Sequence, residues 1–208
     1  MGITTTGRFA ALTNYRDPLA RKSDAPSRGL LVSGFLAGTA PPAEYLAALL
    51  PERTRYEDFN LVVGDPHSLC YLGSRNTRPH NLQPGIYGLS NHLMNTPWPK
   101  VTRAKARLAA GLQEQTMPAA LFDLLGDTSV PPDAELPDTG VGIDWERRLG
   151  SAFIATPDYG TRASTVVLIG SDGYVQFEER RFGPNGAPEG KTVVDFVTGK
   201  DAREDSGR

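Results

Sequence analysis

The order of hydrophobic and polar positions along the chain predicts strands near both ends and helices between them. Runs of β-rich composition predict strands at 2–6, 8–14, 60–64, 68–72, 85–91, 152–156, 163–169, 174–182 and 191–197. Apolar residues at helical spacing predict helices at 29–37, 42–50, 97–112 and 118–125. Because strands and helices do not alternate strictly, this order favours an α+β fold, with helices packed on antiparallel sheets, over a parallel βαβ sheet.

Short turn sequences join neighbouring strands and predict hairpins. Gly7 separates the first two runs, residues 65–67 (Asp-Pro-His) join the second pair, and residues 172–173 (Asp-Gly) join two late strands. The late strands therefore predict an antiparallel meander. Cys70 falls inside a strand of the second hairpin, where a cysteine is usually a buried hydrophobe and seldom a reactive thiol.

We expect a single domain over residues 1–198. Stretches rich in charge and proline at 15–28 and 128–142 lack apolar periodicity, and they predict exposed loops. The sequence shows no internal repeat. Residues 199–208 are mostly charged or small and polar, so they predict a disordered tail.

Charge balance and cysteine content narrow the classes of partner and compartment. The 208 residues carry 22 Lys and Arg against 24 Asp and Glu, a net charge of −2, so a nucleic-acid partner is not expected. No apolar run reaches the roughly 20 residues that a membrane-spanning helix needs, and the first residues lack the basic and apolar regions of a secretory signal. A single cysteine precludes an intramolecular disulfide. We expect a cytoplasmic protein without a membrane span.

Several well-defined catalytic and binding motifs are missing from the sequence. It contains no G-x-x-x-x-G-K-[ST], G-x-G-x-x-G or G-x-S-x-G string, so the nucleotide-binding and serine-hydrolase classes lack their usual apparatus. His67, His80 and His92 lie far apart and show no metal-ligand spacing, so no metal site is expected. Basic residues on one face of the predicted 97–112 helix are more typical of a solvated surface than of an anion site.

Polar residues at predicted strand ends are the best candidates for a binding site. Asn14 and Asn91 each close a strand, and Arg162 opens another; Ser90 and Thr161 lie beside them in sequence. Strand-end amides and a guanidinium can together hold a carbonyl or a carboxylate, because the amides donate hydrogen bonds and arginine supplies a fixed charge. Asparagine is also common in turns and arginine on surfaces, so the pattern alone leaves both interpretations open.

Four strings of the sequence closely resemble the NRDE family, also called the Transport and Golgi organisation 2 family. They are GRFAALTNYRDP at 7–18, YGLSN at 87–91, TPWPKV at 96–101 and YGTRAST at 159–165. Their order along the chain also matches that of the family, and the resemblance extends from Gly2 to about Phe196.

The resemblance implies an N-terminal nucleophile (Ntn) hydrolase-like fold, an αββα sandwich of two antiparallel sheets between helix layers. Family members begin Met-Cys, with the cysteine as the expected nucleophile, and continue to an Asn-Arg-Asp-Glu motif. This sequence has Gly2 in that second position, and its Arg16-Asp17 belongs to the later TNYRD string. We therefore expect that the first strands of the fold are missing, that Met1 is an internal methionine of a longer protein, and that this chain holds no catalytic residue.

The resemblance also implies roles for particular residues. By similarity to cysteine amidases of the Ntn superfamily, Asn14 and Asn91 fall where asparagines bind an oxyanion or position a substrate, and Arg162 falls near a site arginine. The family resemblance further implies a role in handling haem or lipid intermediates and, in eukaryotic members, in secretion and Golgi organisation. No resident cofactor is expected, and haem is a candidate cargo held noncovalently. Its candidate axial ligands are His67, His80, His92, Cys70, Met94 and Met117.

Three classes of function stay open at this point. The first is a protein that binds a small molecule, haem or an acyl compound. The second is an Ntn-type cysteine amide hydrolase whose nucleophile precedes this chain; a thiolate, its own α-amine as base and amide donors around the carbonyl would form an acyl-transfer site. The third is a non-catalytic interaction module. The sequence specifies neither the ligand nor the oligomeric state.

Overall fold

The computed structural model describes residues 1–20, 22–114 and 119–199, and the account below refers to those residues. Residues 200–208 of the predicted tail, and Pro118 at the predicted start of a helix, lie outside the described residues. The described chain is a mixed α+β structure with two antiparallel sheets, which confirms the predicted fold class.

The first sheet has five strands in the order β1-β2-β3-β4-β5, all antiparallel. The strands are β1 (Gly2–Ile3), β2 (Phe9–Asn14), β3 (Phe59–Gly64), β4 (Leu69–Gly73) and β5 (His80–Asn81). The predicted hairpin at 60–72 is confirmed, because Asp65 accepts hydrogen bonds from the backbone N–H groups of His67 and Ser68 and closes the β3–β4 turn.

The second sheet is the predicted antiparallel meander. It consists of β6 (Ala163–Ile169), β7 (Tyr174–Phe182) and β8 (Pro188–Val197), in the order β6-β7-β8. The turn between β6 and β7 contains Gly173 at a φ of +80°, a backbone conformation that favours glycine. A register shift between Arg181 and Phe182 marks an irregularity where β7 meets the start of β8.

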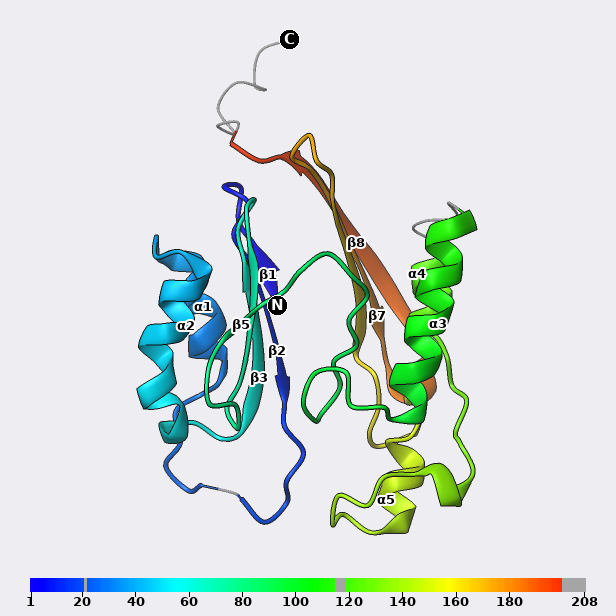
Figure 1. Cartoon of the computed structure of the whole chain (residues 1–208). Coiled ribbons are helices and arrows are strands. Elements are labelled where there is room, and N and C mark those ends of the chain that lie inside the picture. The colour runs from blue at the N-terminus through cyan, green and yellow to red at the C-terminus, as the bar shows by residue number, and fades with distance from the viewer. Residues whose placement is uncertain (21, 115–118, 200–208) are drawn as a thin grey trace.

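Helices lie on the outer face of each sheet, so that the layers run helix, sheet, sheet, helix (Figure 1). Helices α1 (Gly29–Ala37) and α2 (Pro42–Leu49) cover the first sheet, and α3 (Pro99–Glu114) and α4 (Ala119–Leu125) cover the second. The remaining helical segments are α5 (Ile143–Arg148) and three 3₁₀ helices, η1 (Leu50–Arg55), η2 (Asp133–Glu135) and η3 (Pro184–Gly186).

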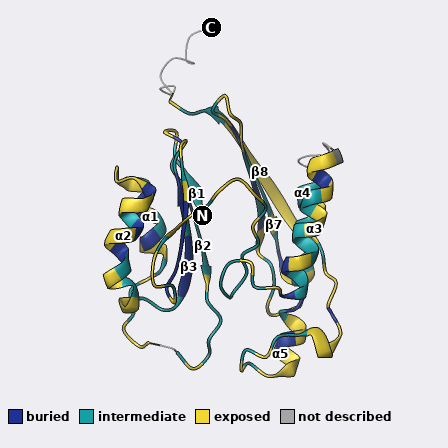
Figure 2. Ribbon diagram, in the orientation of Figure 1, coloured by how far each residue is buried: buried dark blue, intermediate teal, exposed yellow. Residues whose placement is uncertain are grey.

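The main hydrophobic core lies between the first sheet and helices α1 and α2 (Figure 2). Alternate residues of β3, namely Phe59, Leu61 and Val63, point to the helices and are fully buried. Phe35 of α1 packs edge-on against the ring of Tyr45, with 5.2 Å between centroids. Cys70 is 1% exposed within this core, as expected for a structural cysteine.

A second, smaller contact joins the second sheet to its helices. The guanidinium of Arg180 in β7 stacks on the ring of Phe122 in α4, with its carbon 3.6 Å from the ring centroid. Val166 of β6 and Val175 of β7 are buried. The meander is therefore held to its helix layer by a few large contacts on β6 and β7.

Three predictions about secondary structure were wrong. Residues 85–91 form no strand, and residues 152–156 contribute only a single bridge, between Ala155 and Gly160. Helix α3 begins at Pro99, two residues later than predicted. The loop around 85–91 forms because the backbone at Gly88 exchanges hydrogen bonds with Asn95. The loop approaches α3 closely at this glycine, since a Cβ atom there would lie 2.5 Å from Cγ1 of Val101.

Candidate functional site

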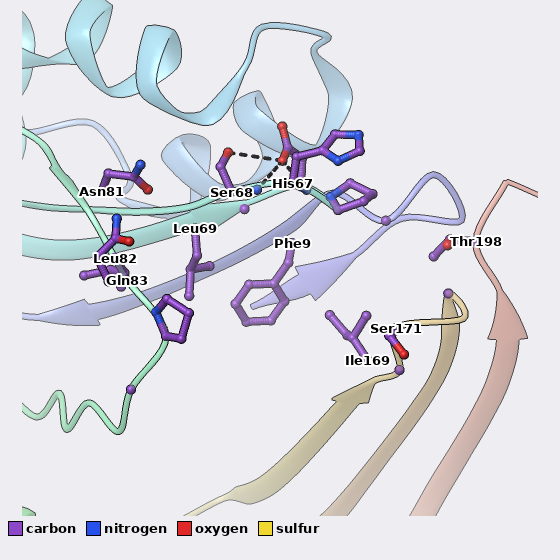
Figure 3. Close-up of a pocket in the computed structure, with 18 of the residues that line it drawn as sticks. Phe9, His67, Ser68, Leu69, Asn81, Leu82, Gln83, Ile169, Ser171 and Thr198 are labelled. Atoms are coloured by element: carbon purple, nitrogen blue, oxygen red, sulfur yellow. Dashed lines mark hydrogen bonds between the residues drawn. The ribbon is translucent and has the colours of Figure 1, made fainter.

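A cavity of about 1150 Å³ lies between the two sheets (Figure 3). One wall comes from Phe9 of β2, the β3–β4 turn and the segment from 81 to 87; the facing wall comes from the end of β6 and the β6–β7 turn. We call it the inter-sheet cavity. Its lining residues share one end of the two sheets and include Phe9, His67, Ser68, Leu69, Asn81, Leu82, Gln83, Ile169, Ser171 and Thr198.

Apolar side chains contribute a substantial part of the lining of the inter-sheet cavity, beside several polar ones. Phe9, Leu69 and Leu82 come from the first sheet and its following segment, and Ile169 comes from the second. Ile169 is 52% exposed, which is high for an isoleucine at a strand end. The described residues that line the cavity include no lysine and no arginine. The cavity therefore suits an uncharged or largely apolar ligand better than an anion.

The carboxylate of Asp65 in this wall accepts hydrogen bonds from its own turn, which stabilise its charged form. Burial acts to raise the pKa of Asp65, but hydrogen bonds from His67 and Ser68 outweigh it and lower the pKa below its usual value. The hydroxyl of Ser68 supplies one of these bonds, at 3.1 Å. Asp65 thus fixes the β3–β4 turn, which leaves the amides of Asn81 and Gln83 as polar groups of the wall.

A second, more polar cavity of about 320 Å³ contains two of the predicted site residues, Asn14 and Asn91. The side-chain amide of Asn91 donates to the backbone carbonyl of Asn14 at 3.0 Å. The backbone N–H of Arg16 donates to the carbonyl of Asn91 at 2.6 Å. The end of β2 and the 88–95 loop are therefore tied together, although 77 residues separate the two asparagines.

The other three predicted site residues do not line this Asn14 cavity. The side chain of Arg162 is 67% exposed and lies 3.6 Å from a carboxylate oxygen of Glu189. Ser90 lines a different cavity, beside α3, and the hydroxyl of Thr161 accepts a hydrogen bond from the backbone of Ile154. The structure thus brings together two of the five residues, and a substrate-binding role for any of them stays a prediction.

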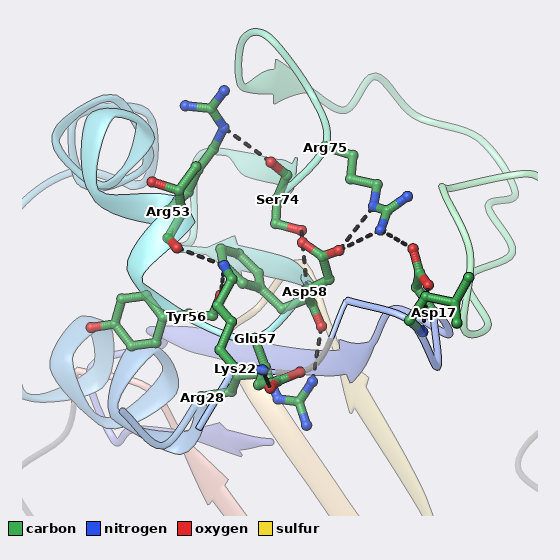
Figure 4. A network of polar contacts seen from close by, with 12 residues as sticks. Asp17, Lys22, Arg28, Arg53, Tyr56, Glu57, Asp58, Ser74 and Arg75 are labelled. Carbon is green, nitrogen blue, oxygen red and sulfur yellow. Dashed lines mark hydrogen bonds and ion pairs between the residues drawn. The ribbon is translucent and has the colours of Figure 1, made fainter. Parts of the chain in front are cut away.

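Charged side chains form a network of polar contacts (Figure 4), and three of them, Asp17, Arg28 and Glu57, also line the Asn14 cavity. Arg75 donates to the carboxylate of Asp58 at 2.9 and 2.6 Å and also pairs with Asp17. Its guanidinium lies 4.4 Å from the ring centroid of Tyr15. Hydrogen bonding to Arg75 is the main cause that lowers the pKa of Asp17. These contacts join the first turn after β2 to the β3 and β4 ends.

Two basic side chains, Arg16 and Lys100, are largely buried beside the loop that follows β2. Arg16 forms an ion pair of 2.9 Å with Glu146 of α5 and lies 5.0 Å from the ring centroid of Trp98. Lys100 donates to the backbone carbonyl oxygen of Leu149 at 2.8 Å. Burial, and then the positive charge of Arg16, lower the pKa of Lys100 to about 8. The TPWPKV string therefore supplies internal contacts between α3, α5 and the loop after β2.

The basic face of α3 is used within the protein. Arg103 pairs with Asp127 at 3.2 Å, and Lys105 donates to the side-chain oxygen of Asn95 at 2.8 Å. Lys100 and Lys105 also border an apolar cavity of about 340 Å³ beside α3 and α4. The sequence favoured a purely solvated basic face on this helix. The structure corrects this prediction, because Arg103 and Lys105 have partners within the protein.

The candidate haem ligands occupy different surroundings. His67 lines the inter-sheet cavity, whereas His92 packs against the rings of Tyr15 and Trp98, with centroids 4.8 and 5.8 Å away. Burial raises the pKa of the Cys70 thiol, so it is neither an available ligand nor an activated nucleophile. Met117 lies outside the described residues. Within the part of the chain that the structure describes, no three His, Cys, Asp or Glu side chains cluster as metal ligands.

The inter-sheet cavity itself was not predicted from the sequence. Its walls come from segments about 100 residues apart, and none carries a charged or catalytic pattern. The available signals were Phe9 on the face of β2 away from the helices and the apolar end of β6 before its turn. Among the described residues, no helix is both long and apolar enough to cross a membrane.

Comparison with known proteins identifies the family. A model of the Transport and Golgi organisation 2 family matches residues 1–184. The Transport and Golgi organization protein 2 homolog of Bos taurus is 38% identical over 196 residues, covering 86% of this chain and 70% of that protein. The Homo sapiens homolog is 37% identical over 199 residues and the Mus musculus homolog 34% over 195, with the same shares covered. The chain therefore belongs to the Transport and Golgi organisation 2 family.

Proposed function

We propose that this chain binds an apolar small molecule without covalent attachment, in the inter-sheet cavity, and thereby carries or presents it. The observation that carries the proposal is the cavity of about 1150 Å³ with its wall of Phe9, Leu69, Leu82 and Ile169. Cavities of about 300–1,000 Å³ with apolar walls and few polar groups are typical ligand sites. The polar groups present, which include the amides of Asn81 and Gln83 and the hydroxyls of Ser171 and Thr198, would orient a ligand rather than neutralise a negative charge.

A lipid-like intermediate is the ligand class that fits this wall best. Covering an exposed side chain such as Ile169 gains free energy in proportion to the apolar area removed from water. A strongly anionic ligand would lack a cationic partner among the described lining residues. The relatives' printed names concern transport and Golgi organisation, and carriage of a lipid intermediate is compatible with both.

Haem is a second candidate cargo because His67 lies in the same wall. An imidazole at the mouth of an apolar cavity can ligate haem iron while the macrocycle lies against apolar side chains. The haem propionates would then face solvent or the amides of Asn81 and Gln83, since the described lining residues include no lysine or arginine. Haem binding by this route would be noncovalent.

The layer order of Figure 1 also supports the proposal that the fold is an Ntn-hydrolase-like αββα sandwich. Amide hydrolysis would require an activated nucleophile beside the Asn14 cavity. Cys70 does not provide one, since it is buried in the helix-facing core with a raised pKa. For the chain as it stands, we propose ligand binding rather than acyl transfer.

A fluorescence titration with the neutral apolar probe N-phenyl-1-naphthylamine tests the binding site. The unmodified chain is expected to enhance the probe's emission with saturation. Ile169→Glu places a carboxylate in the apolar wall and is expected to weaken binding at least about tenfold, because burying a charge there is unfavourable. Val130→Glu is the matched control, since Val130 is 51% exposed and lies outside the cavity. No saturable binding, or equal losses in both variants, would contradict the proposal.

A haemin titration separates the two cargo classes. If His67 ligates the iron, the Soret band should shift with the unmodified chain and with the control His80→Ala, and the shift should be lost with His67→Ala. If the cavity takes lipid-like ligands alone, the haemin spectrum stays that of free haemin while the naphthylamine probe still binds. If neither the Soret shift nor the enhanced emission of the naphthylamine probe is seen, the cavity is not a ligand site.

A further inference from the structure

Strand β8 is an exposed sheet edge. It pairs with β7 on one side, and no other described strand lies along its second side. The strand is ten residues long, and Figure 2 shows most of it as exposed. Val193 and Val194, which point to opposite faces of the sheet, are 44% and 48% exposed. Open edges with apolar side chains on both faces are templates for pairing with another strand.

Two opposite charges on this strand are placed symmetrically about Val193. Lys191 and Asp195 each lie two positions from Val193, and all three therefore share one face of the sheet. Neither charge has a partner among the ion pairs of the described residues. On the β7 side, Lys191 stands opposite Arg180, which has the same sign.

We propose that β8 is the interface of a homodimer, in which two copies of the strand pair antiparallel with Val193 on the two-fold axis. In this register Lys191 of each copy lies opposite Asp195 of the other, and the two Val193 side chains meet. The interface thus contains two cross-strand ion pairs around an apolar contact, and it joins the two three-stranded sheets into one.

The chemistry of the strand favours a second copy over an unrelated strand. A lone lysine on an edge strand normally discourages pairing. Here Asp195 on the same face supplies the opposite charge at the spacing that an antiparallel copy requires, so the strand is complementary to itself. Helix α4 packs on β6 and, through Phe122 and Arg180, on β7. The other sheet edge, β6, carries no charged residue and lacks this symmetry.

Sedimentation velocity with charge-reversal variants tests the interface and its register. The unmodified chain is expected to dimerise with rising concentration. Lys191→Asp and Asp195→Lys each place like charges opposite one another in both pairs, so each is expected to weaken self-association about tenfold or more. An equimolar mixture of the two variants restores opposite charges at both positions and should form a heterodimer. The double variant K191D/D195K should dimerise like the unmodified chain.

The control is Glu135→Lys, which reverses an exposed charge in η2, outside β8. Far-UV circular dichroism checks that each variant is folded. A monomeric unmodified chain at all concentrations would overturn the proposal, as expected if another segment or another protein covers β8. A dimer that survives both single reversals, or single variants that fail to associate when mixed, would overturn it as well. None of these outcomes bears on ligand binding in the inter-sheet cavity.

Discussion

Arg16 and Glu146 form a buried ion pair of 2.9 Å across 130 residues of sequence, with side chains only 9% and 3% exposed. Glu146 also accepts hydrogen bonds from the backbone and the hydroxyl of Thr139. Burial lowers the pKa of Arg16 and outweighs the opposing attraction of Glu146. The pair therefore joins the loop after β2 to α5 at a real cost of desolvation, and it depends on both partners.

Removing one partner of this pair should strongly destabilise the protein. In Glu146→Gln the Arg16 charge stays buried without a counter-charge, and we expect a loss of about 3 kcal/mol or more in the free energy of unfolding. Urea denaturation measures it. Asp144→Asn is the control, because its ion pair with Arg147 is exposed and should contribute about 1 kcal/mol or less. Equal, small losses in the two variants would show that the Arg16 charge is solvated.

Lys100 should make stability depend on pH in the alkaline range. Its pKa is about 8 in the folded chain, against 10.5 for a lysine side chain in water, so between these values the unfolded chain binds more protons. Stability therefore rises with pH across this window. Relative to Lys100→Met, the unmodified chain should gain about 2 kcal/mol between about pH 7 and 9.5. A constant difference between the two proteins would mean that Lys100 keeps an ordinary pKa.

His92 should make the stability of the protein depend on pH in the acid range. Burial, and then the charge of Arg75, lower its pKa in the folded chain, so on acidification the unfolded chain takes up the proton first. The stability of the unmodified chain relative to His92→Gln is expected to fall between about pH 7 and 5. His67→Gln is the control, since His67 is exposed. The idea fails if the His92 variant and its parent lose stability in parallel.

Replacing glycine with alanine should change the free energy of unfolding in opposite directions at Gly88 and Gly111. At Gly88 a Cβ would lie 2.5 Å from Cγ1 of Val101, so Gly88→Ala should cost about 1–3 kcal/mol. At Gly111, inside α3, the nearest atom is Cβ of Ala120 at 3.6 Å, so Gly111→Ala should add about 0.5–1 kcal/mol through helix propensity. Thermal unfolding compares them. Stabilisation at Gly88 would mean that the 88–95 loop lies farther from α3.

The sequence predicted those elements whose signals are local. The β3–β4 hairpin followed from Asp65 and its turn, and α1 and α2 from apolar spacing with proline at the start of α2. The strand predicted at 85–91 does not form, because tertiary contacts outweigh the β-rich composition of the segment. Gly88 exchanges hydrogen bonds with Asn95, and the side chain of Asn91 donates to the end of β2. Such contacts carry no local pattern.

The candidate functional site shows the same difference between features with a local sequence signal and features that depend on tertiary contacts. The sequence singled out Asn14 and Asn91, which share a cavity, but it could not reveal that the amide of Asn91 is already bound to the backbone of Asn14. Arg162 precedes β6 and lies 3.6 Å from Glu189 of β8, a tertiary arrangement of the meander that no local pattern reveals. The inter-sheet cavity depends on the separation of two sheets, which no residue pattern encodes.

The measurement that tests the central claim most directly is a two-dimensional ¹H–¹⁵N NMR titration of the unmodified chain with N-phenyl-1-naphthylamine. If the ligand occupies the inter-sheet cavity, the backbone signals of Ser68, Asn81 and Ile169 should shift with a common saturation curve, while those of Asn14 and Asn91 stay in place. Shifts confined to Asn14 and Asn91, or no saturable shift anywhere, would contradict the account.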